Sequence, residues 1–153
     1  MAKGQDILLS TNPYGKFEEC IISGTPYPGM CMELVPNTTP IGGRQTFRAR
    51  SQTAGAKGPV AVLLPDRDGG KTSTTQYASG DRGFLYWPVA GDELNMLLGD
   101  VAGTADKVTE GDLFGINNNG KLIANNSYTS TPFAARESLP ALTADTLVYC
   151  QYQ

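Results

Sequence analysis

The sequence lacks histidine altogether and is poor in charged residues, and both absences limit what the protein can do. Its 153 residues include 12 Lys and Arg and 15 Asp and Glu, which gives a net charge of −3. Without histidine, Ser-His-Asp and Cys-His catalytic triads and His-ligated zinc or copper sites are excluded. A slightly acidic chain is also a poor nucleic-acid binder, because Lys and Arg supply most of the affinity for phosphates.

Long apolar runs and paired cysteines are missing as well. No run approaches the roughly 20 residues that span a bilayer. The apolar run from Ile7 to Leu9 is too short for a secretory signal peptide. Cys20, Cys31 and Cys150 are odd in number and widely spaced, which is typical of a reducing compartment. We therefore expect a cytoplasmic protein with no membrane partner.

Residues 65–72 resemble a phosphate-binding loop of the type Gly-x-x-x-x-Gly-Lys-[Ser/Thr], but the match fails in detail. Pro65 replaces the first glycine, and two aspartates in the loop would repel the phosphates. The same aspartates fail as a calcium loop, because Lys71 and Tyr77 stand where the EF-hand pattern needs Gly and Glu. We expect neither phosphate nor calcium to bind here.

Four aspartates that follow a glycine are the remaining candidates for acid–base chemistry. Glycine accepts unusual backbone angles and aspartate bonds nearby backbone N–H groups, so the Gly-Asp pair predicts turns rather than catalysis. These aspartates are Asp81, Asp92, Asp100 and Asp112. No catalytic residue, metal site or cofactor is therefore expected, and we do not expect an enzyme.

The expected secondary structure is mainly β. Short apolar or alternating runs, separated by Gly, Pro, Asn and Asp, predict strands. These runs are residues 30–35, 46–51, 58–64, 84–87, 93–98, 113–116, 121–124, 133–139 and 147–152. Asn119-Gly120 predicts a hairpin with a type I′ turn, whereas residues 134–137 suit either a strand or one helical turn. The prediction is a single compact β-rich domain, barrel- or tulip-like, with at most one short helix.

The first 20 residues are expected to form an extended N-terminal arm that precedes the β-rich domain of residues 21–153. Turn-forming residues interrupt the segment, yet it carries large apolar side chains that a solvated tail does not need. Such a segment often folds against a partner; the alternative is an edge strand packed on its own domain. The apolar side chains are Ile7, Leu8, Leu9, Tyr14 and Phe17.

Charge is unevenly distributed along the chain. No acidic residue lies between Glu33 and Asp66, a stretch that contains Arg44, Arg48 and Arg50. The last two are two residues apart, so on a strand they would project from one face. This pattern fits either a basic face that meets an acidic partner or an ordinary solvated strand face.

The order of turns and strands in the second half is informative as a whole. It consists of residues 58–66, 86–94, 108–113, 119–122 and 133–137. This order resembles the head decoration, or capsid cement, proteins of tailed bacteriophages, the lambda-type family in its broad sense. The resemblance implies a small β-rich protein that adds to the outside of an expanded capsid, commonly as a trimer at three-fold or quasi-three-fold sites.

On this resemblance, the expected function is to brace the phage head against internal DNA pressure. The partner would be the major capsid protein, bound by a homotrimer or dimer on the outer virion surface after synthesis in the host cytoplasm. The capsid contacts would be the apolar arm residues and the three arginines named above. Two alternatives remain: another virion protein, such as a tail-tube or head-completion subunit, or a carbohydrate-binding β module with Trp87, Tyr86 and Tyr27 as its sugar platform.

Overall fold

The computed structural model describes residues 6–50, 60–99, 108–117, 119–124, 132–140 and 144–153. These residues contain strands and no helix, which confirms the prediction of a compact, mainly β fold. The strands are β1 (Leu8–Ser10), β2 (Lys16–Ser23), β3 (Cys31–Leu34), β4 (Thr46–Ala49), β5 (Ala61–Leu64), β6 (Arg82–Trp87), β7 (Glu93–Leu98), β8 (Gly115–Ile116), β9 (Leu122–Ile123), β10 (Phe133–Ala135) and β11 (Thr146–Tyr152). Residues 1–5 of the expected arm, and parts of the expected strands at 46–51 and 58–64, lie outside the described residues.

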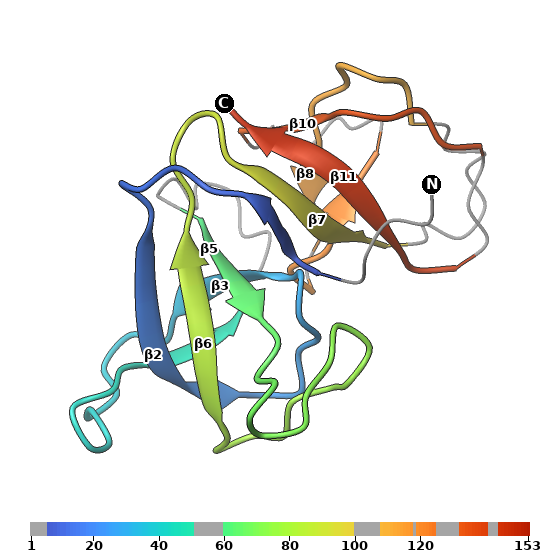
Figure 1. Cartoon of the computed structure of the whole chain (residues 1–153). Coiled ribbons are helices and arrows are strands. Elements are labelled where there is room, and N and C mark those ends of the chain that lie inside the picture. Colours follow the sequence, from blue (N-terminus) through green and yellow to red (C-terminus); the bar gives the residue numbers. More distant parts are fainter. Residues whose placement is uncertain (1–5, 51–59, 100–107, 118, 125–131, 141–143) are drawn as a thin grey trace.

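Two sheets make up the molecule (Figure 1). Five strands close into a barrel in the order β2-β4-β3-β5-β6, with β6 pairing back onto β2. All of its pairs are antiparallel except that of β2 with β4. The second sheet has the order β10-β11-β7-β9-β8, and β1 pairs with β7. Closure removes exposed strand edges from the barrel.

Strand β5 separates two apolar clusters. Successive side chains of a strand point to opposite faces. Accordingly, Ala61 and Leu63 join a cluster of barrel residues, whereas Val62 and Leu64 join the cluster between the barrel and the second sheet. All four are buried, which explains why the sequence shows a continuous apolar run here rather than an alternating one.

The longest described strand, β2, crosses the expected boundary between arm and domain at residue 20. Cys20 and Ile22 are buried in the barrel cluster, and the backbone of Lys16 to Ile21 pairs with β6. The last five residues of the expected arm, 16–20, are therefore part of the barrel wall. The sequence did not predict this strand, because its first half, with Phe17 and two glutamates, is largely exposed and shows no alternating burial pattern.

The prediction that Gly-Asp pairs form turns is confirmed for the three pairs within the described residues. The carboxylates of Asp81, Asp92 and Asp112 each accept a hydrogen bond of 2.9 Å from the backbone N–H three residues earlier. The preceding glycines have φ angles of +91°, +99° and +95°, which an L side chain rarely adopts. The Gly-Asp pair is thus a repeated corner device. Asp100 lies outside the described residues.

The β8–β9 hairpin forms as predicted, but its turn differs from the expected type I′. A type I′ turn needs a positive φ at both central residues. Gly120 has a φ of +75°, but Asn37 is the only non-glycine of the described residues with a positive φ, so Asn119 does not meet this requirement. The side chain of Asn117 accepts hydrogen bonds from the N–H groups of Asn119 (2.8 Å) and Lys121 (3.0 Å). These bonds hold a longer loop in place of a two-residue turn. Likewise, residues 133–135 form β10 and not a helical turn.

Candidate interaction surface

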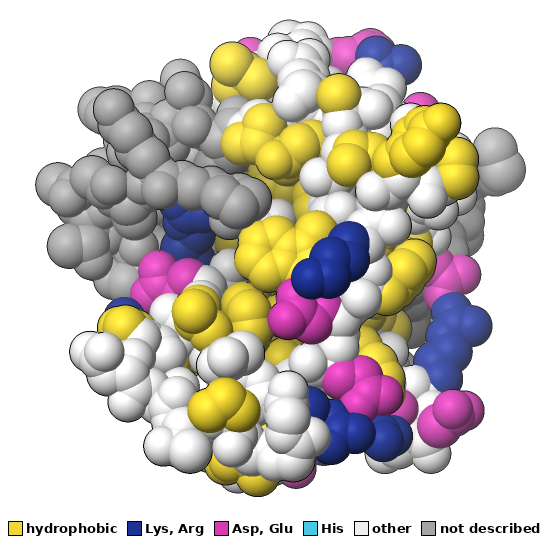
Figure 2. Space-filling view, turned by 90° about the vertical axis from the view of Figure 1, so that its left-hand side faces the viewer, with side chains coloured by type: hydrophobic (Ala, Val, Ile, Leu, Met, Phe, Trp, Pro, Cys, Tyr) yellow, Lys and Arg dark blue, Asp and Glu magenta, His cyan; other side chains and the backbone are white. Residues whose placement is uncertain are grey.

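Apolar side chains at the surface gather where β1 turns into β2. Six large hydrophobic residues are exposed in the described part of the chain, and three of them lie in residues 9–17, which we call the β1–β2 corner. They are Leu9, Tyr14 and Phe17, with Tyr14 84% and Phe17 61% exposed. Figure 2 views the molecule from the β2 side and shows hydrophobic side chains across the middle of this face. Such a patch is typical of a protein–protein contact.

Hydrogen bonds at Asn12 fix the shape of the corner. Its carbonyl accepts the N–H of Gly15 and its side-chain oxygen accepts the N–H of Tyr14, both at 3.1 Å. Its own N–H donates to Oδ1 of Asp92 at 2.5 Å. The corner is therefore bonded to the turn between β6 and β7, which holds its backbone in place.

Asp92 is fully buried beneath the corner. Its Oδ2 accepts hydrogen bonds from the Tyr86 hydroxyl at 2.6 Å and from the Val89 N–H at 2.9 Å. A buried carboxylate is costly unless such donors surround it. Burial, reinforced by Asp92, raises the pKa of the Tyr86 phenol. A side chain at Gly15 would collide with that hydroxyl, so glycine lets the corner lie directly on it.

The structure separates the apolar residues that were expected to contact the capsid together. Ile7 is only 1% exposed and belongs to the cluster between the barrel and the second sheet. Leu8 packs against the same cluster and pairs with Leu94 of β7. Ile7 therefore has no surface with which to touch a partner in this fold. Leu9, Tyr14 and Phe17 are exposed.

The arginines do not form one uncompensated basic face. Arg44 donates through Nε to Glu19 at 2.6 Å, and Arg48 donates through Nε to Glu33 at 2.9 Å. The backbone N–H of Arg50 donates to the Cys31 carbonyl at 2.9 Å. Both glutamates come from neighbouring strands of the barrel. The acidic residues missing from this stretch of the sequence are therefore supplied by strands that lie beside it in the fold.

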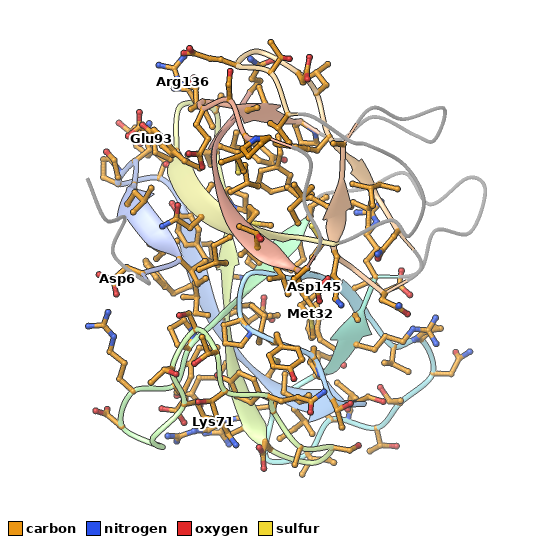
Figure 3. The ribbon with its side chains drawn as sticks, turned by 90° about the vertical axis from the view of Figure 1, so that its right-hand side faces the viewer. Asp6, Met32, Lys71, Glu93, Arg136 and Asp145 are labelled. Atoms are coloured by element: carbon orange, nitrogen blue, oxygen red, sulfur yellow. The ribbon has the colours of Figure 1, made fainter. Side chains whose placement is uncertain are left out.

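The loop that resembles a phosphate-binding motif is used structurally. The Nζ of Lys71 lies 3.0 Å from Oδ2 of Asp81 and 5.5 Å from the centre of the Tyr77 ring. Asp66 accepts the N–H of Gly69 through its side chain and that of Lys71 through its carbonyl. Figure 3 places Lys71 at one end of the barrel, at the far end of the molecule from Glu93 and Arg136.

The three cysteines are buried and free. Burial, with a smaller contribution from the Glu18 charge, raises the pKa of the Cys20 thiol to about 12. Burial likewise raises the pKa of Cys31 to about 12. Within the described residues, no group of three or more His, Cys, Asp and Glu side chains is placed to hold a metal ion. That part of the chain also contains no helix with the length and hydropathy needed to cross a membrane.

The sugar platform of the carbohydrate-binding alternative does not assemble. Tyr86 is fully buried, and its neighbour Trp87 points to the other face of β6. The Trp87 ring lies edge-on to Phe47 at 6.1 Å, and its Nε1 donates to Glu18 at 2.8 Å. Tyr27 packs against the barrel cluster. These rings cannot present one flat stacking surface.

The fold and the surface together define a mainly β protein in which a closed five-stranded barrel joins a second sheet and carries an anchored apolar corner. A solved structure with a similar fold is the N base of the head fiber protein gp8.5 of bacteriophage phi29. The TM-score is 0.56 and the identity 8%, and the match covers 91% of this chain and 94% of that chain. At this identity the likeness concerns the fold alone. No protein-family model and no curated protein sequence matches the chain.

Proposed function

We propose that this protein is a structural component of a bacteriophage head and that it decorates the outer surface of the expanded capsid. The observation that carries the proposal is the likeness of nearly the whole fold to the base of a phage head fiber. The order of turns and strands in the sequence, which resembles lambda-type decoration proteins, independently favours the same location. The partner is the major capsid protein, and the protein reaches the virion from the host cytoplasm.

The β1–β2 corner is the contact surface in this proposal. Aromatic side chains at the centre of an interface commonly contribute most of the binding energy. Tyr14 and Phe17 are exposed aromatic residues on a backbone held by the Asn12–Asp92 bond and by the pairing of β2 with β6, so little backbone entropy is lost when they bind. A homotrimer would present three corners and gain affinity through multivalency.

Co-sedimentation with expanded heads of the parent phage tests the corner. We expect the double variant Tyr14→Ser with Phe17→Ser to bind at least about tenfold more weakly, which corresponds to about 1.4 kcal/mol. Ile41→Ser is the matched control, because Ile41 is an exposed large hydrophobic residue (59% exposed) that lies outside the corner. Urea unfolding of each variant establishes that it remains folded.

The outcomes separate the parts of the proposal. Equal binding by the corner variant and the wild type would reject the corner as the contact, and wild-type protein that ignores expanded heads would reject decoration. Electron microscopy and light scattering of the purified protein address the alternative virion roles. A small soluble oligomer is expected, with a trimer mass, whereas spontaneous rings or tubes would indicate a tail-tube or head-completion subunit.

A further inference from the structure

A second surface feature lies apart from the β1–β2 corner. It is a groove with a volume of about 410 Å³, which we call the β4 groove because β4 forms one of its walls. The loop of residues 23–27 and the β8–β9 hairpin form other walls. The lining residues on which the argument depends are Tyr27, Met30, Arg48, Gln76, Asn119 and Lys121.

Hydrogen bonds hold the walls of the β4 groove in place. The side chain of Gln76 donates to the Thr25 carbonyl at 2.6 Å, and the N–H of Tyr77 donates to the Pro26 carbonyl at 2.9 Å. On the hairpin side, the Asn117 side chain holds the N–H groups of Asn119 and Lys121. The groove is therefore preformed, which lowers the entropic cost of binding a ligand.

The charges that line the β4 groove are of one sign. Arg48 and Lys121 are its only charged lining residues within the described chain, although the whole protein carries a net charge of −3. Their carboxylate partners, Glu33 and Asp145, are not among the lining residues. Figure 3 shows Asp145 at the start of β11, above Met32 of the barrel. The cations are thus fixed in position by carboxylates outside the groove.

Arg48 retains the capacity to bind a further anion. Glu33 accepts from Nε at 2.9 Å, and the Arg48 side chain is 49% exposed. A guanidinium carries five N–H donors, so its two terminal nitrogens can still bind a carboxylate in bidentate fashion. Tyr27 and the buried Met30 also line the groove and supply apolar surface. The Gln76 and Asn119 side chains carry amides suited to a peptide backbone.

We propose that the β4 groove binds an acidic, extended segment of a partner protein. This inference deepens the proposed function and rests on it for the nature of the partner. Carboxylates of the segment would meet Arg48 and Lys121, and an apolar residue would pack against Tyr27. A nucleic acid is the poorer occupant, because the chain as a whole is acidic and the groove has two cations, with Tyr27 and Met30 as apolar lining, in place of an extended basic surface.

An NMR titration tests the groove without using phage heads. The probe is the blocked peptide acetyl-Glu-Ala-Glu-Ala-Glu-amide, and its control is the same peptide with Gln in place of each Glu. We expect saturable chemical-shift changes at the Arg48 Nε–H and at the backbone amides of Asn119 and Lys121. The binding should weaken with added salt. Arg48→Gln should raise Kd at least fivefold. Arg67→Gln is the matched control, because Arg67 is an exposed, ion-paired arginine outside the β4 groove.

Three results would overturn the groove assignment: shifts spread over the whole surface, equal binding of the Gln peptide, or an unchanged Kd for Arg48→Gln. Head binding distinguishes this failure from failure of the proposed function. If heads bind wild type and Arg48→Gln equally and the peptide does not shift the groove, decoration stands and the groove proposal falls. If the peptide binds as expected but heads do not, the groove stands and decoration falls.

Discussion

Gly120 brings the β8–β9 hairpin into direct contact with the barrel. Its carbonyl accepts the N–H of Cys31 at 2.7 Å. Its φ is +75°, and a Cβ at this position would lie 2.5 Å from the Cys31 carbonyl oxygen. Both the backbone conformation and the close approach therefore require glycine. The residue thereby positions Asn119 and Lys121 along the β4 groove.

Replacing this glycine should cost more than its backbone angle alone explains. We expect Gly120→Ala to lower the free energy of unfolding by about 2 kcal/mol or more, from a left-handed conformation worth about 1 kcal/mol and the additional clash with the backbone. Gly80→Ala is the control, because its φ is +91° but nothing lies within 4 Å of the added Cβ. Urea unfolding measures both, and equal losses would contradict the close approach.

Asp81 should make stability depend on acid pH. The hydrogen bond from the Ala78 N–H, followed by the contact with Lys71, holds the pKa of Asp81 below its ordinary value of 3.8. The ionised carboxylate therefore stabilises the fold above about pH 4, and this contribution is lost as the pH falls through the lowered pKa. We expect wild type to be more stable than Asp81→Asn at pH 7, with the difference shrinking below about pH 4. A difference that is constant with pH in urea unfolding would refute this role.

At the scale of single elements, β1 belongs energetically to the folded domain. Ile7, just before it, is buried, and its carbonyl accepts the N–H of Asn95 at 2.7 Å. We expect Ile7→Ala to cost about 2–5 kcal/mol of stability, the range for truncating a buried aliphatic side chain, whereas the exposed Leu9→Ala should cost less than about 0.5 kcal/mol. Deletion of the segment would thus unfold part of the core and cannot serve as a clean test of capsid binding.

The elements that could be predicted from the sequence are those with a local signature. The apolar run of β5 and the asparagine-rich segment before β9 indicate a strand and a hairpin through neighbouring residues alone, although not the type of turn. Strand β2 has no such signature, because its partner β6 lies about 65 residues further along the chain and only pairing with it creates the alternating burial. The same holds for Asn12, whose bond to Asp92 spans 80 residues.

The sequence indicated which types of residue lie at the surface, but it did not indicate which of them lie beside one another in the fold. The exposure of Tyr14 and Phe17 agrees with apolar side chains that have no place in a local core. The partners of Arg44 and Arg48 come from β2 and β3, so no one-dimensional charge count could reveal them. The role of Lys121 could not be predicted either, because Lys121 and Arg48 line one groove only once the hairpin packs on the barrel.

At the scale of the whole molecule, the shared wall should make the two sheets unfold together. Trp87, the only tryptophan, reports on the barrel cluster, whereas Met96 is buried in the other cluster. We expect Met96→Ala to lower stability by about 2–5 kcal/mol and to shift the urea midpoints of Trp87 fluorescence and far-ultraviolet circular dichroism equally. Separate midpoints would show that the barrel and the second sheet are independent folding units.

The position of β5 between two packed clusters also bears on how this protein can evolve. Most strands of a small β domain have one solvent-exposed face at which polar residues can replace one another without loss of stability. Strand β5 has no such exposed side. All four of its side chains are buried, two in the barrel cluster and two in the cluster between the barrel and the second sheet. In a saturation library, we expect selection to remove polar residues at all four sites of β5, while β2 keeps them at its positions other than the buried Cys20 and Ile22. Lineages that diverge beyond recognition elsewhere should still share this short aliphatic tract.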